Sequence, residues 1–600
     1  MGELAPAEAQ GPVVGRVLGT ADATPLQFWV AVAPGAYLQL DDVVVTTREL
    51  PPNGGEQPAP VVIAGVVTQV RARHEGAMFD SDVFAIADGT LPAQVQEAAE
   101  ITTTRVDPEV YVPPQPGAVV RRAEGATRAA ALYFDRMERT VPIGLGRDGA
   151  PVFLNADFLD GTRGAHVSIS GISGVATKTS FATWLLYSVF RSGVLGGAGE
   201  TANTRALIFN VKGEDLLFLD HPNTRLDSNT ERAYAKLGLD AGPFPDVRVF
   251  APPRAGDLTG SPDVASRLTG VDSFYWTVAE FCADRLLPYV FADADDDRQQ
   301  YTMVVHSVTA YLQRNAQPAD GGVVLDGRRV NSYGDLVDLI SERLADDETR
   351  GDWAGTAVGL GTVNAFLRRL VASVKDLSRL VRGDLRGTAP HEINTAESAQ
   401  ITVVDLHNLP DRAQRFVVGV TLRSEFERKE KAGTARPLLF VVLDELNKYA
   451  PREGTSPIKE VLLDIAERGR SLGVVLIGAQ QTASEVERRI VANSAIRVVG
   501  RLDPAEASRP EYGFLPPAQR ARALIAKPGT MFVAQPELPV PLVVEFPFPA
   551  WATRPAEAGA APSATLRSLV QSADPFAVVG AGSRAAPPGN GSLPDDDIPF

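Results

Sequence analysis

The stretch that decides the fold is HVSISGISGVATKTSFATWLLYSVF, residues 166–190. Its first five residues predict a β-strand and its last ten an apolar-faced helix. The connecting loop contains glycines and ends in Lys-Thr-Ser. A phosphate-binding loop (P-loop) needs this order, because the loop amides and the helix N-terminus surround the phosphates, the lysine reaches the outer ones and the hydroxyl binds Mg²⁺.

This loop supplies the candidate nucleotide-binding residues. Lys178 fits the phosphate-binding lysine, and Thr179 fits the hydroxyl that holds Mg²⁺. The match has two departures: six residues separate Gly171 from Lys178 where the consensus has five, and Thr177 replaces the final glycine. A tight strand–helix turn with an incidental lysine is the alternative interpretation. The residues that we expect to contact the nucleotide are Gly171, Gly174, Thr177, Lys178, Thr179 and Ser180.

A second motif, LLFVVLDELNKYAP (438–451), lies in the other half of the chain. It predicts a buried strand that ends in two carboxylates, Asp444 and Glu445. A carboxylate at the end of a strand can hold Mg²⁺, so we assign Asp444 to the metal. The adjacent Glu445 can then orient or deprotonate the attacking water. A solvated acidic pair is the alternative, but its occurrence together with a P-loop favours an ATPase.

A third segment, ERGRSLGVVLIGAQQTASEV (467–486), places polar residues around the next predicted strand. Arg468 and Arg470 precede the strand, and Gln480 and Gln481 stand at its end. An arginine here could reach the γ-phosphate held by a neighbouring subunit, and a glutamine at the strand tip could sense that phosphate. For any one of these residues alone, simple surface solvation is the alternative.

The rest of the chain predicts an α/β protein with a second, smaller β domain. Apolar runs alternate with helical stretches, which is typical of a mainly parallel sheet covered on both faces. We therefore expect an α/β P-loop domain over 126–550, with a helical insertion at about 255–400. Short strands separated by turn residues predict a small barrel or sandwich over 10–125. Residues 551–600 are rich in Ala, Pro and Gly and predict a disordered tail.

The composition excludes several classes of protein. The chain has 600 residues, one cysteine (Cys282) and six scattered histidines, so neither a disulfide framework nor a Cys or His metal cluster is expected. No apolar run reaches the ~18 residues that span a bilayer, and no signal-peptide pattern is present, so we expect a cytoplasmic protein without a membrane partner. The net charge of −16 argues against a simple nucleic-acid coat, although residues 1–165 alone contribute −9.

Taken together, these motifs resemble the HerA family of the HerA/FtsK superfamily of P-loop ATPases, over about residues 10–550. The leading β domain resembles its HAS-type barrel, and the first two motifs resemble its Walker A and Walker B segments. The resemblance implies that the P-loop domain over 126–550 is RecA-like. NVKGED (210–215) resembles the family's Asp-x-x-Gly-Glu stretch, except that Asn210 replaces the aspartate. ITVVDLHNLP (401–410) resembles a family strand that ends in an aspartate. FtsK itself and the secretion coupling ATPases fit less well, because no membrane segments are evident.

The resemblance implies roles that the motifs alone leave open. Arg470 takes the position of an arginine that acts in trans on a neighbour's ATP, and Gln480 takes that of the sensor. MFVAQPELPVPLVVEFPFPAW (531–551) resembles terminal strands and a brace that lie on the adjacent protomer. With ATP and Mg²⁺ as cofactors, the catalytic set then comprises Lys178, Glu445, Arg470 and Gln480, and the metal ligands are Thr179 and Asp444.

The resemblance also implies an activity, that of an ATP-dependent double-stranded DNA translocase or helicase. Six copies would form a ring around DNA and act with a nuclease, such as a NurA-like protein, in DNA end processing, repair or phage defence. Such a ring needs basic residues only along its pore, which the nearly balanced charge of residues 166–550 allows. The longer P-loop keeps a second hypothesis open: a nucleotide-gated scaffold that assembles an effector nuclease with little translocation.

The chain ends in GSLPDDDIPF, which resembles the acidic tip of bacterial single-stranded-DNA-binding proteins. The aspartates would steer the tip to a basic surface, and the terminal phenylalanine would offer an aromatic anchor and a carboxylate for an arginine. A solubilising acidic tail is the alternative. We expect the tip to recruit proteins that bind the single-stranded-DNA-binding protein tip, through Asp595, Asp596, Asp597, Ile598, Pro599 and Phe600.

Overall fold

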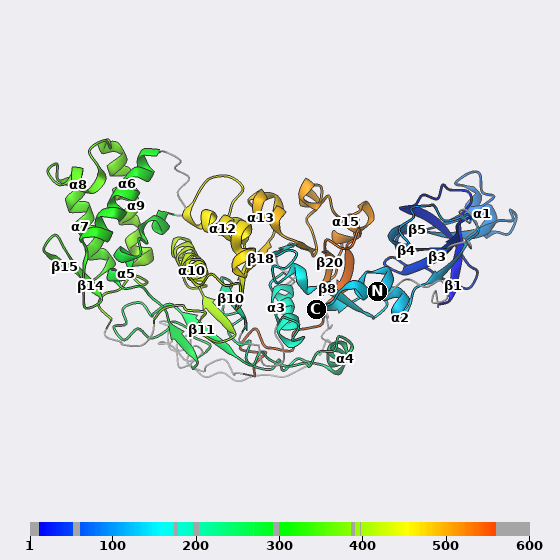
Figure 1. The fold of residues 1–600 in the computed structure, drawn as a ribbon, viewed down its shortest axis with the longest axis horizontal. Coiled ribbons are helices and arrows are strands. Elements are labelled where there is room, and N and C mark those ends of the chain that lie inside the picture. Colours follow the sequence, from blue (N-terminus) through cyan, green and yellow to red (C-terminus); the bar gives the residue numbers. More distant parts are fainter. Residues whose placement is uncertain are drawn as a thin grey trace, which may run out of the picture.

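The computed structural model describes residues 11–51, 60–172, 178–195, 203–267, 269–291, 299–385, 391–396 and 398–559. Two predicted nucleotide-binding residues, Gly174 and Thr177, lie outside the described residues, as does the predicted tip from Asp595 to Phe600. The described chain is elongated, with a β-barrel at one end, a group of helices at the other and a large sheet between them (Figure 1).

The N-terminal barrel is closed, with strand order β1-β2-β5-β4-β3-β6. Neighbouring strands are antiparallel, and apolar side chains such as Phe28, Ile63 and Ile101 fill the interior. Closure decides for the barrel over the sandwich, and it leaves no edge strand unpaired. The elements are β1 (Val13–Val17), β2 (Gln27–Val32), β3 (Val43–Glu49), β4 (Pro60–Glu75), α1 (Asp82–Ala87), β5 (Gln94–Asp107) and β6 (Val119–Arg122).

A 12-stranded sheet forms the middle of the molecule, in the order β12-β11-β16-β10-β17-β18-β9-β19-β20-β21-β7-β8. Neighbours are parallel from β12 to β19 and antiparallel from β19 to β8. The strands are β7 (Thr140–Leu145), β8 (Pro151–Asn155), β9 (Val167–Ser170), β10 (Thr204–Asn210), β11 (Val247–Ala251), β12 (Val271–Ser273), β16 (Ile401–Asp405), β17 (Leu438–Leu443), β18 (Val474–Gln480), β19 (Ile496–Val499), β20 (Thr530–Ala534) and β21 (Leu542–Glu545).

The order of the central strands identifies the domain type. Strand β9 leads into the predicted P-loop, and β17 ends just before Asp444. Strand β18 lies between them and pairs with both in parallel. One strand between the phosphate strand and the carboxylate strand is the RecA-like arrangement, so the predicted α/β class is confirmed.

Helices cover both faces of this sheet, because successive residues of its strands point to opposite sides. In β10, Leu207 and Phe209 belong to one apolar core, and Ala206 and Ile208 belong to another. Helices α10 and α12 pack into the first core and α3 into the second. The helices around the sheet are α2 (Gly125–Ala131), α3 (Lys178–Arg191), α4 (Ser228–Lys236), α10 (Asp411–Ala432), α11 (Leu446–Tyr449), α12 (Pro457–Leu472), α13 (Arg488–Asn493), α14 (Pro504–Ala507) and α15 (Pro517–Ala523).

The chain between β12 and β16 forms the helical end of the molecule (Figure 1). Phe281 of α5 stacks on Phe416 of α10 with 6.2 Å between ring centroids, so these helices share a core with the sheet domain. The elements are α5 (Val278–Ala283), α6 (Gln299–Asn315), the small sheet β13 (Gln317–Ala319), β14 (Gly322–Leu325) and β15 (Arg328–Val330), and α7 (Tyr333–Ala345), α8 (Arg350–Ala354) and α9 (Leu360–Leu377). Across the described ranges, no helix combines the length and apolarity needed to cross a membrane.

The chain beyond β21 folds back onto the sheet domain. Trp551 is fully buried and stacks on Tyr187 of α3, with 4.6 Å between ring centroids. The carbonyl of Thr553 accepts a hydrogen bond from the backbone N–H of Leu216 at 2.9 Å. The prediction of disorder from residue 551 was therefore wrong for residues 551–559. Composition misled it, because the burial of one large indole ring stabilises a segment that is otherwise rich in Ala, Pro and Gly.

Candidate functional site

The candidate site lies where parallel strands end at the same edge of the sheet. Strands β9, β18, β17 and β10 are parallel neighbours, so their carboxyl ends meet there. The start of α3 follows the end of β9, and Asp444 follows the end of β17. The strand order thus brings Lys178 and Thr179 beside Asp444, although the two segments are far apart in the sequence.

Lys178 is the first residue of α3 and is almost fully buried, at 4% exposure. Its Nζ donates a hydrogen bond to the carbonyl oxygen of Gly171 at 2.7 Å. Burial lowers the pKa of Lys178 to about 8, the carboxylate of Asp444 opposes this shift, and the nearby ammonium of Lys212 adds to it. A buried cation at a helix N-terminus is suited to an anion, because an approaching phosphate replaces the hydration that the ammonium has lost.

Asp444 accepts hydrogen bonds from three groups of the site. Its Oδ2 accepts hydrogen bonds from the Thr179 hydroxyl at 2.9 Å and from the Lys212 ammonium at 2.7 Å. Its Oδ1 accepts the backbone N–H of Glu445 at 2.9 Å. A carboxylate and a hydroxyl are hard oxygen ligands of the kind that Mg²⁺ prefers. The donor set therefore fits Mg²⁺, and Asp444 and Thr179 are the candidate ligands.

Glu445 has an unusual backbone conformation, with φ of +56° and ψ of 46°. This left-handed conformation costs a non-glycine residue energy and is common where a site orients a side chain. The Glu445 side chain is about one third exposed, at 34%, and its Oε1 lies 3.8 Å from the Lys212 ammonium. A second carboxylate thus stands next to Asp444, open to water.

Gln480, the predicted sensor, ends β18 and is fully buried. Its side-chain amide donates to the hydroxyls of Ser168 at 2.8 Å and Ser170 at 3.0 Å, both on β9. Its backbone carbonyl accepts the N–H of Gly171 at 3.2 Å. Gln480 is therefore bonded to the strand that leads into the P-loop and not to Asp444.

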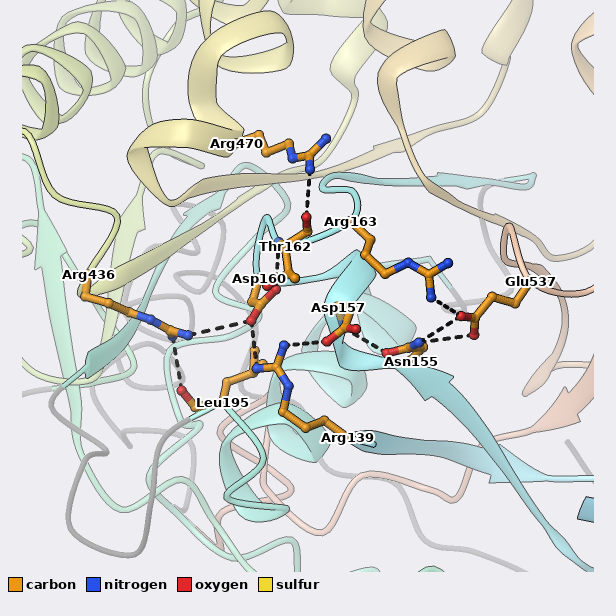
Figure 2. A network of polar contacts seen from close by, with 10 residues as sticks. All are labelled: Arg139, Asn155, Asp157, Asp160, Thr162, Arg163, Leu195, Arg436, Arg470 and Glu537. Carbon is orange, nitrogen blue, oxygen red and sulfur yellow. Dashed lines mark hydrogen bonds and ion pairs between the residues drawn. The ribbon is translucent and has the colours of Figure 1, made fainter. Parts of the chain in front are cut away.

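Arg470, the predicted trans-acting arginine, lies at the opposite edge of the sheet from Asp444. It is in the last turn of α12, just before β18, and it donates from Nε and Nη2 to the carbonyls of Gly161 and Thr162, each at 2.7 Å. That loop precedes β9, so both partners stand at the amino ends of the strands. Figure 2 shows the Arg470 guanidinium directed at this loop. The fold separates Arg470 from the phosphate site of its own chain.

The loop that holds Arg470 is itself fixed by buried polar contacts (Figure 2). Asp160 is 4% exposed in its side chain and accepts the backbone N–H of Thr162 at 2.9 Å. The same carboxylate pairs with Arg139 at 2.7 Å and lies 3.7 Å from Arg436. The two carbonyls that accept hydrogen bonds from Arg470 therefore belong to a loop anchored by a buried acid.

A cavity of about 250 Å³ lies over Lys178 and Asp444. Its lining also includes Arg554, whose Nε donates to Asp215 at 2.8 Å. The predicted residues that line it are Lys178, Thr179, Ser180 and Asp444. Lining residues that were not assigned a role from the sequence include Asn210, Lys212, Asp215, Thr553 and Arg554.

Two of these unassigned residues are basic. The sequence could have pointed to Lys212 as a site residue, because lysine is rare in this chain, with nine in total and none before Lys178. It also stands inside the NVKGED stretch that was already singled out. Arg554 carried no signal, because it falls in the segment whose composition predicted disorder.

No protein-family model matches this chain, and no curated protein matches it in sequence. Solved structures of similar fold include VirB4 of Thermoanaerobacter pseudethanolicus, at 14% identity and a TM-score of 0.42 over 68% of this chain and 96% of that one. Plasmid coupling protein TrwB in complex with the GTP analogue GDPNP is 13% identical, with a TM-score of 0.42 over 70% and 93%. Genome packaging NTPase B204 from Sulfolobus turreted icosahedral virus 2, in complex with AMPPCP, is 13% identical, with a TM-score of 0.20 over 25% and 69%. At such identities the likeness concerns the fold alone.

Proposed function

We propose that this chain is a cytoplasmic, Mg²⁺-dependent ATPase that moves double-stranded DNA through a homo-hexameric ring. The observation that carries the ATPase proposal is the convergence of Lys178, Thr179 and Asp444 on one cavity at the carboxyl edge of a parallel sheet. These groups match the needs of phosphoryl transfer, which are a cation for the phosphates and oxygen ligands for the metal. The resemblance of the sequence to the HerA family supports DNA as the substrate.

The chemistry begins at the N-terminus of α3. There the Lys178 ammonium and the first amides of the helix attract the phosphates. Thr179 and Asp444 would hold Mg²⁺, which supplies charge neutralisation at the phosphate oxygens. Glu445 is the second carboxylate and is partly open to water, so it is placed to accept the proton of the water that attacks the terminal phosphorus.

The position of Arg470 supports an assembly in which ATP lies between neighbours. Because Arg470 stands at the opposite edge of the sheet from Asp444, it is separated from the phosphate site of its own chain, and we assign it to the site of a neighbouring subunit. A closed ring gives every subunit one neighbour on each side, so each Arg470 faces one foreign site. In such a ring Gln480 links the P-loop strand to β18 and passes the state of the site to α12.

The partners in this proposal rest on sequence resemblance. We include a nuclease, such as a NurA-like protein, that acts on the translocated DNA in end processing, repair or phage defence. We also include recruitment of proteins that bind the single-stranded-DNA-binding protein tip, through the last residues from Asp595 to Phe600.

The test is ATP turnover with and without double-stranded DNA, together with displacement of a triplex-forming strand. Lys178→Ala and Glu445→Gln should each lower turnover by about 100-fold or more, and Lys236→Ala, on the exposed end of α4, should not. Unchanged turnover in both site variants would contradict the mechanism. Nucleotide binding without any triplex displacement is the result expected of a nucleotide-gated scaffold.

A mixing experiment tests the role of Arg470. Subunits with Arg470→Ala keep an intact phosphate site, and subunits with Lys178→Ala keep an intact arginine. Each preparation alone should be inactive, and a mixture should regain part of the turnover, because one kind supplies Arg470 to the other. A mixture as inactive as its components would exclude the trans role.

A further inference from the structure

Lys212 shares one carboxylate oxygen with the proposed metal site. Its ammonium lies 2.7 Å from Asp444 Oδ2, and the same oxygen accepts the Thr179 hydroxyl at 2.9 Å. Thr179 and Asp444 are the ligands that fit Mg²⁺, so the ammonium stands at the oxygen that the metal would use. The Lys212 ammonium therefore neutralises the Asp444 carboxylate, which is the group that Mg²⁺ needs as a ligand.

An ammonium and a divalent cation exclude each other at this oxygen. Both require the lone pairs of Asp444 Oδ2, and two cations in contact with one carboxylate oxygen repel each other. Free Mg²⁺ would therefore have to displace Lys212, and the ion pair that is lost would weaken its binding to Asp444. A phosphate chain changes this balance, because its oxygens accept the ammonium when the carboxylate gives it up.

The surroundings of Lys212 allow this movement. Its side chain is 42% exposed, and it stands in the segment that follows β10, where a lysine stem can swing and its charge stays hydrated. Lys178, Lys212 and Asp444 line the same cavity, so the released ammonium remains next to any phosphate bound there. Glu445 Oε1 also lies 3.8 Å from the ammonium and attracts it toward the site.

We propose that Lys212 is a built-in competitor of Mg²⁺ that makes metal binding at Asp444 conditional on a nucleotide phosphate chain. This role rests on the proposed function and deepens it. Without nucleotide, Lys212 keeps free divalent cations off Asp444. With nucleotide, the ammonium transfers to the phosphates and the carboxylate becomes a metal ligand. The residue thus binds nucleotide and gates the metal.

The test measures metal and nucleotide binding separately, on the full chain and without turnover. Mn²⁺ replaces Mg²⁺ as the probe, and its binding is followed by electron paramagnetic resonance. Lys212→Met keeps the length of the side chain and removes the charge. Without nucleotide, it should bind Mn²⁺ at least ten-fold more tightly than the unaltered chain. In EDTA, it should bind a fluorescent ADP at least ten-fold more weakly, because one phosphate-binding cation is lost.

Three further variants define the origin of the effect. Lys212→Arg keeps the charge and should keep Mn²⁺ excluded. Lys236→Met removes an exposed lysine outside the cavity and should change neither binding constant. Adding Asp444→Asn to Lys212→Met should abolish the gained Mn²⁺ binding, which locates the metal at Asp444.

The outcomes separate this inference from the proposed function. If the unaltered chain binds Mg²⁺–ADP but Lys212→Met gains no Mn²⁺ affinity, the competition is excluded and the ATPase proposal stands. If neither chain binds nucleotide with or without metal, the proposed function itself fails. Circular dichroism of each variant shows whether it is folded, and Lys212→Arg tests the charge should Lys212→Met not fold.

Discussion

Two aspartates stand at the carboxyl ends of two strands of the same sheet and have different surroundings. Asp405 is the last residue of β16, Asp444 follows β17, and β10 lies between the two strands. Asp405 accepts the side-chain amide of Asn210 at 2.9 Å, and the His407 Nδ1 lies 2.9 Å from both of its oxygens. Asp444 instead faces a cavity and is held by a lysine and a hydroxyl that can both rearrange.

The difference shows that a buried carboxylate at a strand end is not by itself a functional group. Asp405 and Asp444 are 1% and 4% exposed, so burial does not distinguish them. Their partners do, because an amide and an imidazole that are fixed in the fold satisfy Asp405 permanently. Asp444 is satisfied by groups that a phosphate and a metal can replace. We therefore expect Asp405 to stabilise the fold and Asp444 to serve the reaction.

The surroundings of Asp405 also show what Asn210 does in this chain. Its amide donates to Asp405 and to the carbonyl of Gly213 at 2.8 Å. An aspartate at this position would place two carboxylates in contact in a buried site, and like charges there repel. The amide is the group that fits beside Asp405 in this chain.

The largest expected effect is a difference in ATP turnover between variants of the two aspartates. Asp444→Asn should lower ATP turnover by about 10²–10³-fold, because a metal ligand loses its charge. Asp405→Asn is the matched control and should lower it less than about ten-fold. Phosphate release at saturating Mg²⁺–ATP measures both. Equal losses in the two variants would mean that Asp405 belongs to the reaction as well.

The second effect concerns the free energy of unfolding, which we expect to fall more for the Asp405 variant than for the Asp444 variant. Asp405→Asn should reduce the free energy of unfolding by about 2–3 kcal/mol, because it removes the charge of a buried carboxylate and replaces one of its two acceptor oxygens with an amide donor. Asp444→Asn should change it by less than about 1 kcal/mol, since Lys212 is free to turn to water. Urea unfolding followed by circular dichroism gives both values. A greater loss for Asp444→Asn would refute the assignment of Asp405 to stability.

A smaller loss of stability is expected when Asn210, which donates to Asp405, is replaced by a residue that can carry a negative charge. Asn210→Asp should destabilise the chain by about 1–2 kcal/mol at pH 8, because one of two adjacent carboxylates must ionise against the other. The loss should shrink at pH 5, where a proton can be shared between them. Asn229→Asp, on the exposed first turn of α4, is the control and should cost nothing. A pH-independent loss at Asn210 would point to packing instead of charge.

The smallest effect is a dependence on pH. The hydrogen bond to Asp405 raises the pKa of His407 above its usual value of 6.5, and the charge of Asp405 adds to this. The pair then stabilises the fold fully below pH 6.5, and this contribution is lost as the pH rises through the higher folded pKa. Unfolding at pH 6 and pH 9 should thus show a greater cost of Asp405→Asn at pH 6. The same cost at both values would exclude a charged pair.

The local motifs were predictable because each is contiguous in the sequence. The strand, loop and helix around Lys178 and the strand before Asp444 form as short segments whose pattern needs no distant partner. The parallel sheet also followed, because apolar runs alternate with helices. The barrel was expected from the family resemblance and is confirmed, whereas the strand pattern alone left barrel and sandwich open, since the same short strands suit both until the first and last of them pair.

The sequence by itself thus determined the α/β class and the group of residues at the carboxyl edge, namely Lys178, Thr179 and Asp444. Only the tertiary structure decided that Lys212 meets Asp444, that Asp405 is bonded to Asn210, and that Arg470 stands at the far edge. The physical reason is that these contacts join strands and loops that are distant in the chain. They depend on the order of strands in the sheet, which local periodicity does not encode.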